Sequence, residues 1–118
     1  MAYIDGYVLA VPINNKARYQ KLAEEAGVVF KDHGALSVVE SWGDDVPDGD
    51  LTSLPMAVKC KDDEVVVFSW ITWPSREARD KGNQAAMEDP RMQGWDMNDM
   101  PFDGKRMIFG GFTTIVEL

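Results

Sequence analysis

The ten residues YIDGYVLAVP at positions 3–12 decide the fold. They are rich in β-forming side chains and end at Pro12, which cannot donate a hydrogen bond to a continuing ladder. They therefore predict a strand. Successive side chains of a strand point to opposite faces of its sheet. The side chains of both faces are apolar here: Tyr3, Tyr7, Leu9 and Val11 alternate with Ile4, Val8 and Ala10. A sheet built on this strand needs a cover on each face.

The rest of the chain predicts an α+β domain around that strand. Further strand patterns occupy residues 35–42, 55–60, 64–73 and 105–118, the last interrupted by a bulge or close backbone approach at Gly110-Gly111. An apolar stripe at helical spacing predicts a helix from Asn14 as N-cap to about His33, and Ser75 begins a second helix. Asp89-Pro90 predicts a short extra helix. The order is β-α-β-β-α-β with one additional strand, which we expect at 55–60 in a hairpin with 64–73.

The two-faced strands also predict a homodimer. Residues 64–73 and 105–118 are apolar on both faces, like residues 3–12, whereas two helices can cover only one face of a sheet. Leaving about six large side chains in water would forgo on the order of 10 kcal/mol, which is comparable to the stability of a whole domain. The alternative is that residues 90–103 fold back over the open face. Three aspartates in that segment argue against it.

Length and composition limit the class of protein. A chain of 118 residues is the size of one domain, so residues 1–118 are expected to form one core. Twelve Lys and Arg against twenty Asp and Glu give a net charge of −8, which argues against nucleic acid as a partner. Cys60 is the only cysteine and fits a reducing compartment. With no basic leader and no apolar run of roughly 18 residues, the sequence predicts a cytoplasmic protein outside the membrane.

His33 and Asp44 are the candidate catalytic residues. His33, the only histidine, is either a general base facing a pocket or a partly buried residue whose charge suits the end of a helix. One histidine makes no multi-histidine metal site, and the acids of loop 43–50 lack EF-hand spacing, so we expect no metal. Asp44 lies beside Trp42, where desolvation would raise its pKa toward neutrality.

The candidate ligand-binding residues are three tryptophans and two arginines. Trp42, Trp70 and Trp73 lie on or at the ends of predicted strands and either line one cavity or pack in the core. Arg79 and Arg106 either clamp a carboxylate of a ligand or pair with the acids of the chain itself. No phosphate-loop or dinucleotide spacing is present, so we expect no cofactor.

Two hypotheses of function follow. In the first, a pocket between sheet and helices binds a small, partly aromatic or acidic organic molecule, or transforms it without a tightly bound cofactor. In the second, the protein is a non-enzymatic interaction or stress-associated dimer module, and the same residues serve packing. The motif search assembles no catalytic set that would decide between them.

Several blocks of the sequence resemble those of the YbaA-like family of short bacterial proteins. They are His33-Gly34-Ala35, Trp42-Gly43-Asp44-Asp45-Val46-Pro47, Phe68-Ser69-Trp70 with Trp73-Pro74, Asp89-Pro90-Arg91-Met92, Pro101-Phe102-Asp103-Gly104-Lys105-Arg106 and Gly110-Gly111-Phe112. The resemblance covers essentially the whole chain. It implies a dimeric α+β barrel, in which two ferredoxin-like sheets pack face to face, and it carries over no catalytic residues.

Overall fold

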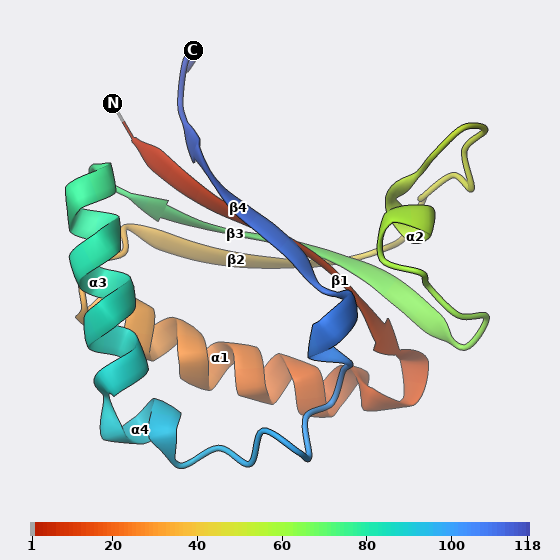
Figure 1. The fold of residues 1–118 in the computed structure, drawn as a ribbon, viewed down its shortest axis with the longest axis horizontal. Helices are drawn as coiled ribbons and strands as arrows, with labels where there is room; N and C mark the ends of the chain where they lie inside the picture. Colours follow the sequence, from red (N-terminus) through yellow and green to blue (C-terminus); the bar gives the residue numbers. More distant parts are fainter. Residues whose placement is uncertain (1) are drawn as a thin grey trace.

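One antiparallel sheet and two long helices make up the computed structural model, which describes residues 2–118 (Figure 1). The elements follow the order β1 (Tyr3–Pro12), η1 (Ile13–Asn15), α1 (Lys16–Asp32), β2 (Ser37–Trp42), α2 (Leu54–Ala57), β3 (Glu64–Trp73), α3 (Arg76–Glu88), α4 (Pro90–Gln93), η2 (Gly104–Arg106) and β4 (Ile108–Thr113). The predicted α+β class is confirmed.

The four strands lie in the order β2-β3-β1-β4, with every neighbouring pair antiparallel. Both α1 and α3 lie on one side of the sheet (Figure 1). This order is compatible with a ferredoxin-like arrangement, with β1 and β3 in the middle. We call the side covered by these helices the helix-facing side, and the opposite side the outer face.

Two clusters of the core lie between the sheet and the helices. Leu9, Val11, Tyr19 and Val67 are buried together, and Tyr3, Ala35, Ile71 and Trp73 form a second cluster. The odd-numbered residues of β1 and β3 supply the sheet's part of both, as strand alternation requires. A third cluster of Ala10, Val58 and Val66 lies at one end of the outer face.

The prediction of an additional strand at 55–60 is wrong, because residues 54–57 form the single helical turn α2. Ser53 Oγ accepts a hydrogen bond from Met56 N at 3.1 Å, and Pro55 stands in the first turn, where its missing N–H is tolerated. Lys59 then turns the chain at φ 50°. Val58, one of the apolar residues that suggested a strand, is fully buried and packs with Ala10 and Val66 instead.

The structure also tests three smaller predictions. The long helix has Asn15, not Asn14, as its N-cap residue, because Ile13–Asn15 form a 3₁₀ turn first. Ser75 caps α3 as expected, with Oγ accepting from Ala78 N at 3.1 Å. The last strand covers only Ile108–Thr113, and its two glycines pair in continuous register with β1 without a bulge.

Residues 90–103 do not fold over the outer face, so that alternative is wrong. Figure 1 shows α4 and the stretch after it running along the helix layer. Asn15 Nδ2 donates to Pro101 O at 3.1 Å, and Arg18 pairs with Asp99 at 3.1 Å, which ties this stretch to the start of α1. Among the helices of residues 2–118, none is both long and apolar enough to cross a membrane.

Gly82 of α3 should not tolerate even a methyl group. A Cβ at this position would lie 2.2 Å from Trp73 Cζ3 and 2.7 Å from His33 O, and neither the buried indole nor the backbone can yield easily. We predict that Gly82→Ala lowers the free energy of unfolding by about 1–3 kcal/mol, measured by urea denaturation. Gly104→Ala is the matched control, because a Cβ there meets nothing within 4 Å. Equal stability of the two variants would contradict this packing.

Candidate functional site

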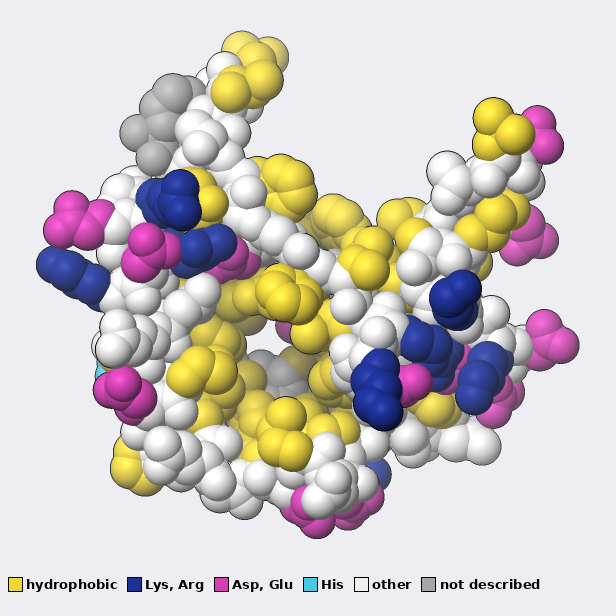
Figure 2. Space-filling view, in the orientation of Figure 1, with side chains coloured by type: hydrophobic (Ala, Val, Ile, Leu, Met, Phe, Trp, Pro, Cys, Tyr) yellow, Lys and Arg dark blue, Asp and Glu magenta, His cyan; other side chains and the backbone are white. Residues whose placement is uncertain are grey.

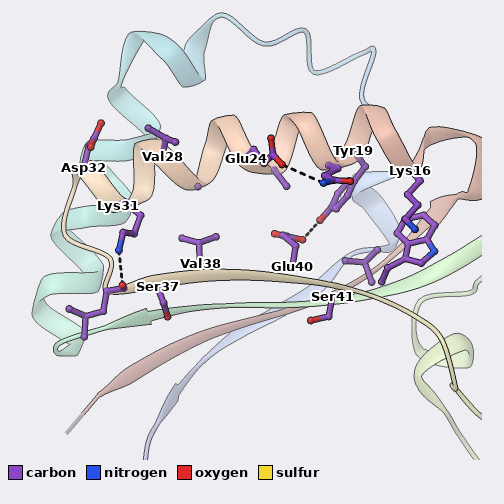
Figure 3. Close-up of a pocket in the computed structure, with 16 residues that line it drawn as sticks. Lys16, Tyr19, Glu24, Val28, Lys31, Asp32, Ser37, Val38, Glu40 and Ser41 are labelled. Atoms are coloured by element: carbon purple, nitrogen blue, oxygen red, sulfur yellow. Dashed lines mark hydrogen bonds between the residues drawn. The ribbon is translucent and has the colours of Figure 1, made fainter.

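A groove of about 890 Å³ runs between α1 and β2. One wall is the face of α1 from Lys16 to Asp32, and the other is β2, with Val67 of β3 at the bottom (Figure 3). Gly27 lets the helix approach the strand, since a Cβ there would touch Val38 Cγ1 at 3.5 Å. Seen from the other side, the molecule is hollowed between the sheet and the helix layer, and hydrophobic side chains surround the opening (Figure 2). The groove between α1 and β2 is open to solvent, and apolar residues such as Val28, Val38 and Val67 stand in it beside polar and charged ones.

Three polar residues cross the helix-facing side of the sheet in one row. Ser69 pairs with Tyr7 of β1 on one side and with Glu40 of β2 on the other. The neighbouring rows in the same register, Leu9–Val67–Trp42 and Asp5–Ile71–Val38, are mostly apolar. Ser69 is buried and small, so it leaves space between its two larger neighbours. We call Tyr7, Ser69 and Glu40 the polar row.

Glu40 is the member of the polar row that lines the groove. Tyr19 of α1 donates a hydrogen bond from Oη to Glu40 Oε1 at 2.6 Å (Figure 3). Glu40 is exposed to solvent along the open side of the groove, while other groups pack against its carboxyl. Their desolvation raises the pKa of Glu40, against the smaller lowering by the hydroxyls of Tyr19 and Ser69. A carboxyl of this kind takes up and releases protons closer to neutral pH than a free glutamate does.

The two tyrosines near Glu40 remain protonated at neutral pH. Burial, followed by the charge of Glu40 and the hydrogen bond to it, raises the pKa of Tyr19. Burial and the charge of Asp5 raise the pKa of Tyr7 to about 12, against the opposing charge of Arg79 and with a smaller further contribution from Glu40. Both hydroxyls are therefore hydrogen-bond donors, and Tyr19 uses its proton to orient Glu40.

The mouth of the groove carries charges of both signs. Lys16 Nζ stands 5.2 Å from the centre of the Trp42 ring, and Lys31 Nζ donates to Leu36 O at 2.8 Å. Glu24 lies on the same wall and accepts from Gln20 at 3.4 Å. These long side chains surround the opening (Figure 3).

The structure does not place the three predicted tryptophans in one cavity. Trp42 lines the groove, Trp70 lies on the outer face, and Trp73 is fully buried in the core, with its Nε1 donating to Asp5 Oδ2 at 3.0 Å. The strand period explains the separation, because Trp70 and Trp73 are an odd number of residues apart and so point to opposite faces.

His33 and Asp44 lie at opposite ends of β2, roughly 20 Å apart at 3.3 Å per strand residue. His33 Nε2 is 2.9 Å from Asp89 Oδ2, and Arg91 bonds the same carboxylate as well as Asp32. Hydrogen bonds from Arg91, and then from His33, hold the pKa of Asp89 well below its usual range. Asp44 is exposed in its loop, so the expected desolvation beside Trp42 is absent. The two residues do not form one site.

Arg79 pairs with a buried acid of the chain itself. Its Nε donates to Asp5 Oδ1 at 2.9 Å, and Asp5, only 4% exposed, also receives bonds from Trp73 and from Asn83 at 3.4 Å. A Cβ at Gly111 would lie within 2.5 Å of both Arg79 Nη2 and Tyr3 Oη, so the glycine makes room for this cluster. The close backbone approach predicted for Gly110-Gly111 is thereby explained.

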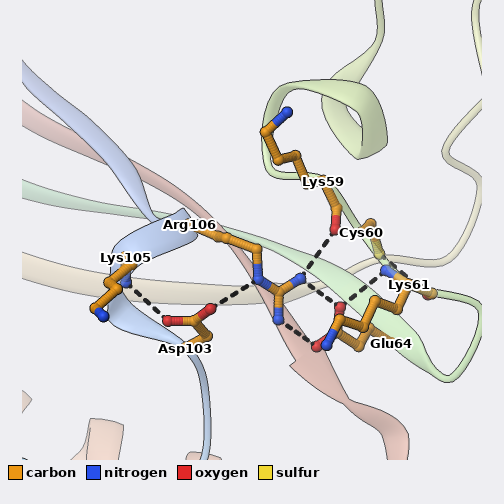
Figure 4. A network of polar contacts seen from close by, with 7 residues as sticks. All are labelled: Lys59, Cys60, Lys61, Glu64, Asp103, Lys105 and Arg106. Atoms are coloured by element: carbon orange, nitrogen blue, oxygen red, sulfur yellow. Dashed lines mark hydrogen bonds and ion pairs between the residues drawn. The ribbon is translucent and has the colours of Figure 1, made fainter.

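Arg106 is likewise engaged within the chain. It binds Glu64 through two hydrogen bonds of 2.7 and 2.8 Å, and it also donates to Asp103 at 3.0 Å and to Lys59 O at 2.9 Å (Figure 4). One guanidinium thus joins the start of β3, the turn after α2 and η2. Neither arginine lines the groove.

The residues that carry the groove's polar chemistry were missed by the sequence reasoning. A usable signal existed for Glu40, which stands between Val38 and Trp42 on the same face of a predicted strand. Asp5 gave a similar signal between Tyr3 and Tyr7. An acid in an apolar alternation must either face water or find partners.

The Arg106 cluster should give an acid-sensitive contribution to stability. The hydrogen bonds of Arg106 lower the pKa of Glu64, so their stabilisation is present above about pH 4.3, where a free glutamate titrates, and is lost as the pH falls through the lowered pKa. We predict that Arg106→Gln lowers the free energy of unfolding by about 2–3 kcal/mol at pH 7 and by much less at pH 3, measured by urea denaturation.

Arg18→Gln is the matched control for that experiment, because both members of the Arg18–Asp99 pair are exposed and such pairs contribute little. A loss for Arg106→Gln that is the same at both pH values would contradict the assignment to ionised Glu64.

Comparisons with known proteins agree with the resemblance seen in the sequence. The "Uncharacterized protein YbaA" of Escherichia coli K12 is 53% identical over 117 residues, which cover 99% of each chain. The proteins of the same name in Escherichia coli O157:H7 and Shigella flexneri match to the same extent. Residues 2–104 also match the family model described as "Protein of unknown function (DUF1428)". The chain therefore belongs to the DUF1428 family, together with these YbaA proteins.

Proposed function

We propose that the groove between α1 and β2 binds a small organic molecule in each subunit of a cytoplasmic homodimer. The observation that carries this proposal is the groove itself, in which apolar side chains stand beside convergent polar groups. Ligand sites in proteins commonly have this composition and a volume of about 300–1,000 Å³. The net charge of −8 and the lone Cys60 support a reducing, cytoplasmic setting.

The groove favours a ligand with an apolar or aromatic body. Val38, Val67 and Ala23 offer apolar contacts, and Trp42 offers an indole face beside them. Polar recognition would come from Glu40, Tyr19 and the ammonium group of Lys16. We no longer propose an acid–base role for His33 or Asp44, because the first is paired with Asp89 and the second lies exposed outside the groove.

The proposed dimer rests on the outer face of the sheet. Large apolar side chains surround a shallow hollow of about 650 Å³ there, among them Ile4, Val8, Phe68, Trp70, Ile108 and Phe112. Phe68 and Phe112 are 46% and 60% exposed. A contiguous exposed apolar patch on a sheet face is typical of a protein interface, and a second copy offers an equally apolar face of the same shape.

Two projecting arms support a second copy as the occupant. The loop before and around α2 and the C-terminal tail after β4 both extend from the sheet on the side opposite α1 and α3 (Figure 1). Hydrophobic side chains follow the floor between them (Figure 2). Leu51 on one arm and Ile115 on the other are almost fully exposed. In a face-to-face pair these tips would contact the partner. The pair would be a dimeric α+β barrel.

The second candidate function is a dimer module that acts by interaction alone. The observation that favours it is the same outer face, which would be buried whether or not the groove binds a ligand. The two candidates differ in what blocking the groove does. A binding protein loses a ligand, whereas an interaction module is unaffected.

Blocking the groove should abolish ligand binding without unfolding the protein. Val28 lines the groove and is 56% exposed, so Val28→Trp can place an indole in the opening without displacing the core. We predict that compounds found to bind the wild type, in a ligand-observed NMR screen of small aromatic and carbonyl compounds, bind Val28→Trp at least 10-fold more weakly. A 10-fold loss corresponds to about 1.4 kcal/mol.

Ile13→Trp is the control, because Ile13 is similarly exposed, at 53%, and does not line the groove. Binding that is equally weakened in both variants, or a screen without any compound sensitive to Val28→Trp, would favour the interaction module.

A charge on the outer face should break the proposed dimer. We predict that Phe112→Asp sediments as a folded monomer in analytical ultracentrifugation, whereas the wild type sediments as a dimer, because an unpaired carboxylate would be buried in the interface. Met87→Asp is the control, since Met87 is 53% exposed on α3, away from that face. A monomeric wild type would refute the proposed dimer.

A further inference from the structure

Two pairs of residues stand opposite each other across one end of the groove. On α1, Lys16 and Tyr19 are three residues apart and therefore share a helix face. On β2, Glu40 and Trp42 are two residues apart and share the helix-facing side. Tyr19 bonds Glu40, and Lys16 stands over Trp42 (Figure 3). Glu40 and Trp42 are about 7 Å apart in the repeat of a strand, and the ammonium group of Lys16 lies 5.2 Å from the centre of the Trp42 ring.

The charges of this end of the groove select among ligands. A ligand carboxylate at Glu40 would be repelled by its charge, and a ligand ammonium beside Trp42 would be repelled by Lys16. The apolar walls disfavour a strongly hydrated molecule. What fits both ends is a neutral molecule with an apolar body, a weakly acidic proton near Glu40 and an oxygen acceptor near Lys16. A ketone or aldehyde with hydrogen on the adjacent carbon has these features.

We propose that Glu40 takes a proton from the carbon next to the carbonyl group of such a compound, while Lys16 Nζ binds the carbonyl oxygen. The C–H bond breaks, its proton moves to a carboxylate oxygen of Glu40, and its electron pair forms the C=C bond of an enolate as the carbonyl π electrons move to oxygen. The negative oxygen is stabilised by the ammonium group. Return of a proton from Glu40 to carbon restores the carbonyl compound, so no oxidant or reductant is required.

The surroundings of Glu40 suit this role. Tyr19 donates to Oε1 and so fixes the orientation of the carboxyl in the groove. Tyr19 is thus a positioning residue rather than a catalytic one. Glu40 is exposed to the groove, and the groups packed beside it raise the pKa of its carboxyl, which makes it a stronger base than a free glutamate. The proposal rests on the proposed binding function, since it needs a ligand in the same groove.

The test is deuterium exchange into 2-indanone, a neutral bicyclic ketone with acidic hydrogens beside its carbonyl group. We expect the wild-type protein in D₂O to accelerate loss of the CH₂ proton signal over buffer alone, followed by NMR. Glu40→Gln should lower the enhancement by about 10²–10⁴-fold, the usual contribution of a general base. This variant keeps an oxygen that can accept from Tyr19, and circular dichroism checks its fold.

Two control variants test whether the effects are specific to Glu40 and Lys16. Glu25→Gln removes a carboxylate and Lys21→Met removes an ammonium group from exposed positions of α1 that do not line the groove. Both should keep the wild-type exchange rate. Lys16→Met should lower it by about 10²-fold, the scale of one lost group that stabilises an oxyanion.

The outcomes separate this inference from the proposed function. Binding of 2-indanone that is weakened by Val28→Trp, without any acceleration of exchange, overturns the proton transfer and leaves the binding groove standing. Exchange that persists in Glu40→Gln overturns the role of Glu40. Absence of 2-indanone binding, alongside binding of other compounds from the screen, overturns the ligand class. Absence of any groove ligand overturns both proposals.

Discussion

The pairing of β1 with two neighbours is the constraint on which the rest of the structure depends. β1 lies between β3 and β4, and its side chains are apolar on both faces. α1 and α3 cover the odd-numbered side chains, and the turn around α2 covers only one end of the other face. The remaining apolar surface is left in water within a single chain. Burial on one side creates the helix-lined groove, and exposure on the other creates the surface to which we assign the dimer.

The carboxylates of the sheet strands follow a common rule. Asp5 is satisfied by Trp73, Arg79 and Asn83, and Glu64 by Arg106, so these carboxylates have partners within the chain and serve the fold. Glu40 differs, because it has a partner in Tyr19 and also faces the groove. A carboxyl that is held in place and still accessible is suited to chemistry on a ligand. The paired ones are suited to stability.

Local signals made most of the fold predictable, and the site was much less so. The strand at 3–12, the cap at Ser75 and the helix at Asp89-Pro90 depend on neighbours in sequence. The turn at 55–60 was mistaken for a strand because its apolar residues outweighed Ser53 and Pro55 in the pattern. Trp42, a predicted ligand-binding residue, lines the groove, but Glu40 beside it was missed. Its partner Tyr19 is 21 residues away, and only the packing of α1 on β2 brings them together.

The claim of one sheet with two differently used faces is tested most directly by isotope-filtered NMR on an equimolar mixture of ¹³C-labelled and unlabelled chains. The account predicts intermolecular nuclear Overhauser effects from side chains of the outer face, Phe68, Trp70 and Phe112 above all, and none from the groove residues Tyr19 and Val38. Intermolecular effects that arise from α1 and β2 instead, or their complete absence at concentrations where the outer face should be paired, would contradict it.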